Sequence, residues 1–387
     1  MKNSLSILIL VALTFGGFTL LKFQLSRSGQ TKNATIPAVT TSLIQVAKNE
    51  QPELNQAREV KSKKAADNSL NDPYKVAVDQ ITEMLESKRT LNFKRAVFLT
   101  ENAYYSGKLD WNSFCSEIEK IKLALNRMIA AKNLQRYKTA GNWAVFSYMM
   151  DSIPENNYRP CRYDFENFMG DKDYESFMVS HLLKTKKGNC HSLPYLYKIL
   201  ANEANVEAFI ATAPMHCFIK HKDEKGQWWN LELTSGTFSR TSFIMESFNV
   251  SDAGIESGLY MKPLSEKESV ALCLSDLLDY YQRQKGIYYG SLVQKAYKAG
   301  LKVYPKSILQ LAKRDDIKYR LDNAMKTHGL NDYHKIKPYP ELVQLKKQLD
   351  ENIRYIQKIG YSKLTPAQYK DKVLEIKKGQ QTEARIK

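Results

Sequence analysis

Apolar residues recur at helical spacing once the chain has passed Pro73. One amphipathic helix is predicted over about 111–132, where a single stripe of apolar side chains repeats every three or four positions: Phe114, Ile118, Ile121, Leu125 and Met128. A second helix is predicted over about 174–184, with an apolar side formed by Phe177, Met178, His181 and Leu182. The segment between them, 156–173, is rich in turn residues and is expected to form a loop. Residues 73–172 are therefore predicted to be a mainly helical region.

The pattern changes shortly after Gly188. A helix is predicted to follow Cys190, because apolar residues return there at helical spacing: Leu193, Leu196, Tyr197, Leu200 and Ala204. Pro194 lacks the N–H that an interior helical position donates, so it fits only in the first turn. The helix is thus expected to begin just before Pro194, with Cys190 at its N-terminal end.

Three strands are predicted next, over 206–212, 216–222 and 228–233. If the last two are joined by a three-residue turn at 224–226, Asp223 faces Gln227 and the register of the hairpin follows. That register gives one apolar face, with Cys217, Ile219, Trp229, Leu231 and Leu233. The opposite face gathers His216, Phe218, Trp228, Asn230 and Glu232. The predicted fold class is therefore α+β, with a helix packed on an antiparallel sheet over 173–264.

This arrangement suggests a chemical site. A cysteine at a helix N-terminus is favoured as the thiolate, which is the nucleophilic form. In the predicted register His216 and Glu232 are diagonal neighbours, with an expected separation of about 7–8 Å between backbones. Cys190, His216 and Glu232 are therefore the candidate catalytic residues of a thiol acyl-transfer site. Trp228 and Asn230 share the face of the histidine and are the candidate substrate-binding residues.

The remaining histidines fit this site less well. His191 should point roughly 100° away from Cys190 around the helix axis, and His221 lies on the opposite face of the hairpin. The adjacent pairs Cys190–His191 and His216–Cys217 do not indicate zinc, because neighbouring side chains point apart and the usual cysteine spacing is absent. No metal and no other cofactor is expected.

These residues resemble the transglutaminase-like branch of the papain-like superfamily. The resemblance consists of a glycine before a helix-opening cysteine, a histidine that begins a strand, and a tryptophan four residues before an acid that is followed by x-Thr. Here these are Gly188 and Cys190, then His216, then Trp228 and Glu232 with Thr234, within about 177–238. Glutamate stands where aspartate is commoner, and the flanking segments are unlike the protein-crosslinking enzymes.

The resemblance implies that Cys190 attacks an amide carbonyl, that His216 carries the proton, and that Glu232 orients the imidazole. The Cys190 backbone N–H is a candidate oxyanion donor, and the second donor is unassigned. Water as acceptor gives a peptidase or amidase and an amine gives a transferase, so both remain open for a peptide or protein substrate. The alternative is a catalytically inactive transglutaminase-like domain that serves as a protein-interaction module.

The last third of the chain predicts further helices. Leu277 and Tyr280, followed by Val293, Tyr297, Gly300, Leu301 and Pro305, resemble one degenerate tetratricopeptide repeat. A helical extension is therefore expected over 265–360, either packed on the core or offering a surface to a protein partner. The lysine-rich end, 361–387, is expected to be a solvated basic tail.

The N-terminus predicts a membrane segment. Residues 5–21 are uncharged and mostly apolar, so 1–23 is expected to be an uncleaved membrane anchor, with a cleaved signal segment as the alternative. Residues 24–72 are polar and predict a flexible linker that holds the folded body, expected on the extracytoplasmic side. The five cysteines lack the regular spacing of a disulfide scaffold, so at least one should be free. The net charge of +17 is scattered, which argues against nucleic acid as a partner.

Overall fold

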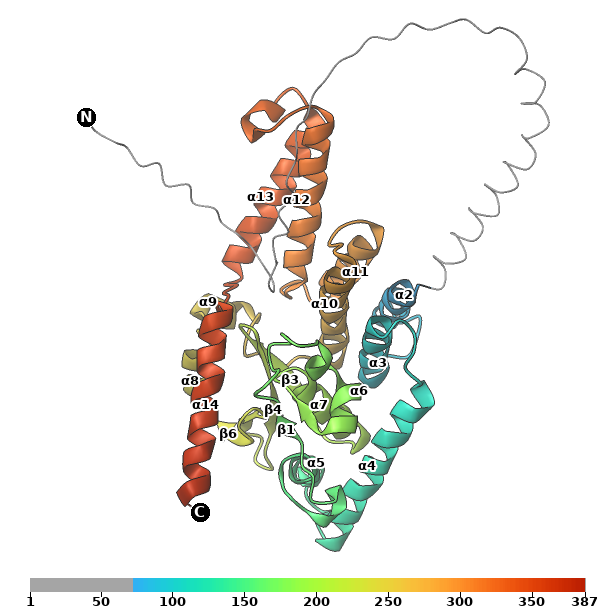
Figure 1. The fold of residues 1–387 in the computed structure, drawn as a ribbon, viewed down its shortest axis with the longest axis vertical. Helices are drawn as coiled ribbons and strands as arrows, with labels where there is room; N and C mark the ends of the chain where they lie inside the picture. Colours follow the sequence, from blue (N-terminus) through green and yellow to red (C-terminus); the bar gives the residue numbers. More distant parts are fainter. Residues whose placement is uncertain (1–71, 387) are drawn as a thin grey trace, which may run out of the picture. The chain divides into compact units, whose positions relative to one another are not determined.

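The computed structural model describes residues 72–386 (Figure 1). The predicted membrane anchor at 1–23 and nearly all of the predicted linker at 24–72 lie outside these residues. Within 72–386, no helix combines the length and the apolar composition that a membrane span requires. The fold of this part is mostly helical with a small antiparallel sheet, so the predicted α+β class is confirmed at that level.

The first helices follow the predicted pattern. They are α2 (Pro73–Leu85), α3 (Phe93–Tyr104), α4 (Trp111–Ala131) and α5 (Ala140–Met150). The side chains of Asp72, Asn92 and Asp110 accept hydrogen bonds from the first turns of α2, α3 and α4, which fixes where each helix begins. The α4 helix matches the prediction for 111–132 to within one residue.

The helix predicted over 174–184 is broken. A 3₁₀ turn (Glu175–Phe177) is followed by an extended Met178 and then by α6 (Val179–Thr185). The cause is the buried carboxylate of Glu101 on α3, which accepts the N–H of Val179 at 2.6 Å and that of Ser180 at 2.9 Å. A negative charge at these free N–H groups starts a new helix there.

The predicted loop at 156–173 contains a short strand. Within it, β1 (Arg162–Tyr163) pairs in parallel with β2 (Lys187–Gly188), just before Cys190. Downstream, α7 (Ser192–Glu203) begins just before Pro194, as predicted from that residue.

The sheet has the strand order β3–β4–β5–β6, and all neighbours are antiparallel. Its strands are β3 (Phe209–Ala213), β4 (His216–Lys222), β5 (Trp228–Glu232) and β6 (Thr237–Ser239). Ile219 pairs with Leu231 and Lys222 with Trp228, which is the predicted register. The apolar face differs from the prediction at one end, because Trp229 is 47% exposed and packs edge-on against Phe238 of β6.

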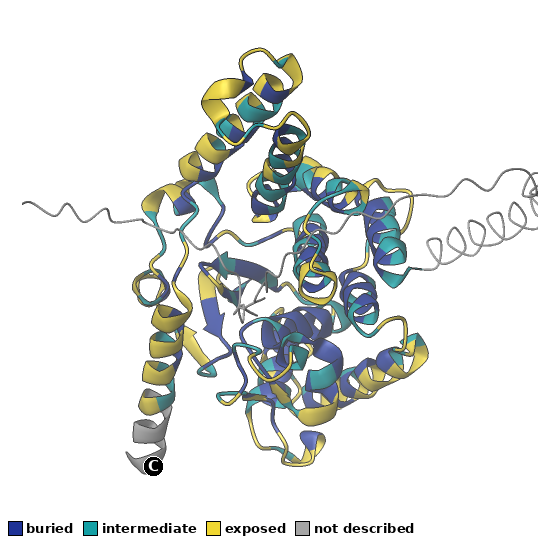
Figure 2. Ribbon diagram, turned by 45° about the horizontal axis from the view of Figure 1, so that its top comes forward, coloured by how far each residue is buried: buried dark blue, intermediate teal, exposed yellow. Residues whose placement is uncertain are grey.

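The C-terminal half is helical. It contains α8 (Thr241–Ser247), α9 (Asp252–Ser257), α10 (Glu266–Lys285), α11 (Ser291–Val303), α12 (Leu309–Thr327), α13 (Pro340–Lys358) and α14 (Pro366–Ile386). The α10 helix packs on α2, α3 and α11, so the predicted extension shares a core with the first helices. Gly300 lets α11 lie close to α12, because a Cβ atom there would lie 2.2 Å from a methyl carbon of Leu309, which would have to shift. A continuous set of buried side chains runs from Tyr74 to Val373 (Figure 2).

The end of the chain differs from the expected solvated tail. Residues 366–386 form α14, and both Tyr369 and Val373 on its inner side are buried. The two residues lie four positions apart, which puts them on one side of the helix. The basic segment therefore docks on the folded body through a narrow apolar stripe.

Candidate functional site

Cys190 lies in the turn that leads into α7. The neighbouring Asn189 is buried, and its side-chain oxygen accepts the N–H groups of His191 at 2.9 Å and Ser192 at 3.3 Å. Its amide nitrogen donates to the carbonyl oxygen of Phe168 at 3.1 Å. Asn189 thus caps the helix and ties the turn to the loop beside it, so the thiol is held at the helix N-terminus.

Gly188 is needed for the same turn. A Cβ atom at this position would lie 2.4 Å from the Ser192 hydroxyl oxygen and 3.3 Å from Leu182. The Ser192 hydroxyl in turn donates to the carbonyl oxygen of Ser176 at 2.6 Å. The glycine in the predicted motif therefore allows α7 to approach the preceding strand closely.

His216 and Glu232 form a buried pair. The His216 Nε2 atom lies 2.6 Å from the Glu232 Oε2 atom, and Glu232 Oε1 accepts the backbone N–H of Thr234 at 2.9 Å. Both side chains are inaccessible to solvent. The register of β4 and β5 makes the two residues diagonal neighbours, so the carboxylate fixes the orientation of the ring.

The second nitrogen of the ring, Nδ1, lies on the side of the thiol. This nitrogen and the Cys190 sulfur both lie near the Tyr369 hydroxyl, at 3.5 Å and 2.8 Å, and His216 and Cys190 each act on the pKa of the other. The structure therefore brings the three candidate catalytic residues, Cys190, His216 and Glu232, together in one buried cluster.

The charges of these groups depend on one another. Burial raises the pKa of the Cys190 thiol, but the neighbouring His216, followed by Tyr369 and His191, outweighs it, so this pKa is lowered. Burial lowers the pKa of His216, but Glu232 and then Cys190 outweigh it and raise the pKa to about 10. Burial likewise raises the pKa of Glu232, and His216 turns the balance so that it is lowered. Each shift favours the charged form of its group, which is the thiolate of Cys190, the imidazolium of His216 and the carboxylate of Glu232.

Three aromatic side chains enclose this group. The Tyr369 hydroxyl of α14 donates to the Cys190 sulfur at 2.8 Å and lies 3.5 Å from His216 Nδ1. Phe248 stacks on the His216 ring, with the ring centroids 3.8 Å apart. Tyr163 of β1 is buried, and its hydroxyl has no hydrogen-bond partner. Burial, and then the neighbouring Cys190, raises the pKa of this hydroxyl well above its usual value, and Tyr369 is a second polar neighbour.

The candidate substrate-binding residues lie apart from the triad. Trp228 contacts Phe209 and the ammonium groups of Lys220 and Lys222. The Asn230 amide donates to the Ser239 carbonyl oxygen and the Thr241 hydroxyl, which fixes β5 against the following segment. Trp228 is four residues before Glu232 on a strand, a distance of about 13 Å along the backbone. Neither residue is in contact with the thiol.

The residues set aside on sequence grounds have other partners. The His191 Nδ1 atom lies 2.9 Å from the Phe177 carbonyl oxygen, and Nε2 lies 3.1 Å from Asp276. Burial raises the pKa of Cys217 well above the usual range, which leaves it a poor nucleophile. None of the five cysteines, all of which lie within 72–386, forms a disulfide.

Sequence reasoning missed Tyr163, Phe248 and Tyr369. Tyr163 lies in a segment predicted to be a loop, and Tyr369 lies in the expected basic tail. The local signal available was the spacing of Tyr369 and Val373, which is that of one helix face, but nothing in the spacing identifies the surface on which that face docks.

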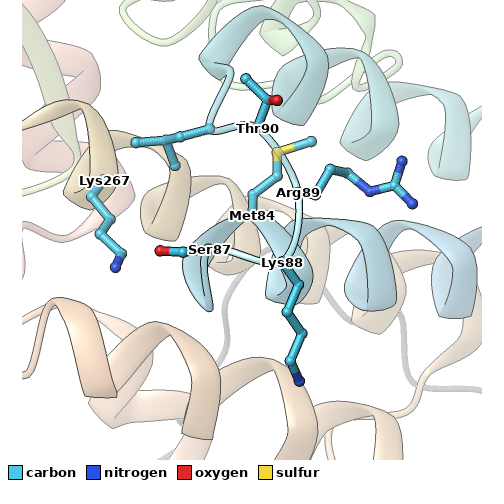
Figure 3. A pocket seen from close by; sticks show the side chains of 7 residues that line it. Met84, Ser87, Lys88, Arg89, Thr90 and Lys267 are labelled. Atoms are coloured by element: carbon cyan, nitrogen blue, oxygen red, sulfur yellow. The ribbon is translucent and has the colours of Figure 1, made fainter.

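A surface hollow of about 440 Å³ is lined by Met84, Ser87, Lys88, Arg89, Thr90, Leu91 and Lys267 (Figure 3). It shares no residue with the triad. Two of its cations have partners, because Lys88 pairs with Glu86 and Arg89 with Glu83. Within 72–386, no three or more His, Cys, Asp or Glu side chains gather in a way that could hold a metal ion.

Comparisons of this chain with models of known protein families, with curated proteins and with solved structures find no match.

Proposed function

We propose that this protein is a thiol-dependent amide hydrolase or acyl transferase of transglutaminase-like type that acts on peptide-like substrates. The observation that carries the proposal is the buried cluster in which His216 pairs with the Glu232 carboxylate through Nε2, while its Nδ1 atom and the Cys190 sulfur both lie near the Tyr369 hydroxyl. The thiol at the start of α7, against a sheet that carries the base and the acid, is the arrangement expected of a papain-like core. No step of this chemistry requires a metal or an organic cofactor.

The proposed reaction begins with attack of the Cys190 thiolate on an amide carbonyl carbon. The new S–C bond gives a tetrahedral oxyanion, and the His216 imidazolium then protonates the leaving nitrogen as the C–N bond breaks. A thioester remains on Cys190. Water or an amine attacks it, His216 takes up the proton of the attacking group, and the C–S bond breaks to regenerate the thiolate. Glu232 holds the imidazolium in place during both steps.

The oxyanion needs donors, and Tyr163 is the best candidate for the second one. Its strand pairs with Gly188, two residues before the nucleophile, so its position is coupled to that of Cys190. Its hydroxyl is buried and lacks a partner of its own, which leaves it able to donate to a substrate oxygen. The Cys190 backbone N–H at the helix N-terminus is the first candidate donor.

One observation favours a second candidate function. Cys190 is only 7% exposed, and the Tyr369 hydroxyl contacts its sulfur. A domain that is permanently closed in this way would be catalytically inactive and would serve, with helices α10 and α11 resembling a tetratricopeptide repeat, as a protein-interaction module. In either case the apolar segment at 1–23 would tether the body to a membrane.

The test is alkylation of the folded full-length protein with iodoacetamide over a range of pH, read out by mass spectrometry of the peptide that contains Cys190. We expect the thiolate form of Cys190 to appear below the ordinary thiol range of about 8.5, and His216→Ala to move the profile up to that range. His191→Gln is the matched control, since that ring faces Asp276, and it should change the profile less. A Cys190 profile that is the same with and without His216 would favour the interaction module.

Turnover separates the two acyl acceptors. Casein with a fluorescent primary amine measures transfer by incorporation of the dye, whereas release of ammonia or new N-termini without incorporation measures hydrolysis. Cys190→Ala is the negative control for both measurements.

A further inference from the structure

The triad has an access problem. Attack requires a carbonyl carbon within about 3–3.5 Å of the nucleophile. The Cys190 sulfur is buried and already has a hydroxyl oxygen 2.8 Å away. A substrate carbonyl and the Tyr369 hydroxyl cannot occupy this position together. If the protein is an enzyme, the group that must leave is therefore Tyr369.

Tyr369 fills the site completely. Its hydroxyl lies between the Cys190 sulfur at 2.8 Å and the His216 Nδ1 atom at 3.5 Å, which are the two atoms that a reacting amide must contact. Its ring packs against Phe168 and Phe248, with centroids 6.1 Å and 6.2 Å away. The side chain thus occupies the space that the proposed acyl group would need, next to the Tyr163 hydroxyl.

The rest of α14 is held weakly. Of its described side chains, only Tyr369 and Val373 are buried, and Leu374 on the other side is 37% exposed. The Lys377 ammonium group lies over the ring of Phe165, 5.3 Å from its centroid. A helix that buries so few apolar side chains belongs to the part of a structure that opens at low free-energy cost.

The connection to α13 is anchored separately. The Ser251 hydroxyl donates to the Gly360 carbonyl oxygen at 2.7 Å, and the Tyr260 hydroxyl donates to that of Ser362 at 2.9 Å. Beyond this anchor α14 has a cap of its own, because Thr365 and Gln368 exchange hydrogen bonds between side chain and backbone. The anchor and the buried Leu364 can therefore stay in place while the helix leaves as a unit from about residue 365. Figure 1 shows α14 running beside α8 and α9.

We infer that α14 is an inhibitory cover over the proposed active site, and that Tyr369 stands where the substrate carbonyl group binds. This inference rests on the proposed function, because a cover inhibits only if the covered site is catalytic. Displacement of α14 exposes Cys190 and makes room for a substrate oxygen next to the Tyr163 hydroxyl. The alternative role for Tyr369, that of a catalytic donor within a permanently assembled site, makes the opposite prediction for activity.

The experiment compares full-length variants. Tyr369→Ala combined with Val373→Ala removes the buried stripe, and Leu374→Ala is the matched control on the exposed side of the same helix. Tyr369→Phe keeps the ring and its packing but removes the hydroxyl, so it tests the contact with the sulfur in a chain that remains folded. Thermal unfolding monitored by circular dichroism identifies any variant that has lost its structure.

We expect the double variant to raise the rate of Cys190 alkylation about 10-fold or more, because the accessible state becomes a larger fraction of the population. Leu374→Ala should leave the rate unchanged, and Tyr369→Phe should raise it to a smaller extent. Amine incorporation into casein should rise in the same order. If Cys190 reacts no faster in the double variant than in the wild type, the inference that α14 covers the thiol is refuted.

A second outcome would also overturn it. If Tyr369→Phe alkylates faster but incorporates less amine than the wild type, Tyr369 is a catalytic donor and not a cover. Failure of the proposed function looks different, because Cys190 in the opened variant would then react as an ordinary thiol whether or not His216 is present.

Discussion

Substitution of Glu232 by glutamine tests the electrostatic basis of the site. The change keeps the size of the side chain and an oxygen for the Thr234 N–H, but it removes the charge that faces His216. The pKa of His216 is raised from its ordinary value of 6.5 to about 10. This corresponds to about 5 kcal/mol in favour of the imidazolium, at about 1.36 kcal/mol for each pH unit.

Glu232 is the first of the influences that raise this pKa against the opposing effect of burial, and Cys190 is the next. Removing one partner from a buried ion pair costs ~3–5 kcal/mol, and we expect the loss of the carboxylate charge to fall in this range. In Glu232→Gln the pKa of His216 should fall by about 2 units or more, because burial is then opposed less. The Cys190 thiolate, which the imidazolium stabilises, should form at higher pH.

The assay is the pH dependence of Cys190 alkylation in the Tyr369→Ala background, where the thiol is accessible. We expect Glu232→Gln to shift the profile upward by at least 1 pH unit, roughly half of the change at His216. Glu246→Gln, an exposed acid on α8, is the control and should leave the profile in place. Superimposed profiles for Glu232→Gln and its parent would refute the electrostatic coupling described here.

Three further predictions concern stability and catalysis. Tyr163→Phe removes a buried hydroxyl that lacks a partner, so the free energy of unfolding in urea should stay the same or rise by up to ~1–3 kcal/mol. Acylation of Cys190 should slow about 100-fold, because an oxyanion donor is lost. A loss of stability with normal acylation would contradict the oxyanion role. Gly188→Ala should lower the free energy of unfolding by about 1–3 kcal/mol, because the new Cβ atom meets the Ser192 hydroxyl. Combined with Ser192→Ala, it should cost less than the sum of the two single substitutions. Strict additivity of the two free-energy changes would exclude this clash. A third prediction concerns the pH dependence of stability. His216 has a raised pKa, so its contribution to stability is complete below about pH 6.5 and is lost as the pH rises through 10. Cys190 has a lowered pKa, so its contribution is complete above about pH 8.5 and is lost as the pH falls through its folded pKa. Urea unfolding of the wild type relative to the double variant Cys190→Ser with His216→Gln should therefore give a stability difference that falls as the pH rises from about 8.5 to 10, where the contribution of Cys190 is complete and that of His216 is being lost. A difference that stays constant or grows over this range would disprove the raised pKa of His216.

Local patterns were sufficient to predict the His216–Glu232 geometry. The side chains of a strand alternate with period two, so a slip of one residue would have exchanged both faces of the hairpin. With the turn at 224–226, a single register puts the apolar residues of the two strands together, and the observed pairing of Ile219 with Leu231 is that register. The start of α7 was equally constrained, since Pro194 fits only in a first turn.

The features that were not predicted depend on contacts between distant parts of the chain. Glu101 divides the helix expected over 174–184, although it lies 78 residues before Val179 and nothing near either residue indicates the contact. Tyr369 reaches a thiol 179 residues away. Between 366 and 378 two apolar residues are buried among lysines, acids and glutamines, and so short a stripe does not distinguish a docked helix from a solvated one.

The charges of the triad bear on the choice between an enzyme and an inactive module. Burying an imidazolium and a carboxylate costs desolvation energy that their mutual attraction only partly offsets, and apolar side chains of the same size stabilise a core as well or better. Phe218 and Leu231, on the same two strands, are buried apolar side chains that fill the core. A domain that served only to present surfaces would gain nothing from burying His216 and Glu232 beside them. The arrangement has a use if the thiol is to be ionised, since each member moves the pKa of the next in the direction that a nucleophile requires. Closure by α14 fits the same interpretation, because a reactive thiolate that is kept covered is protected from oxidation and from unselected substrates until the helix is displaced.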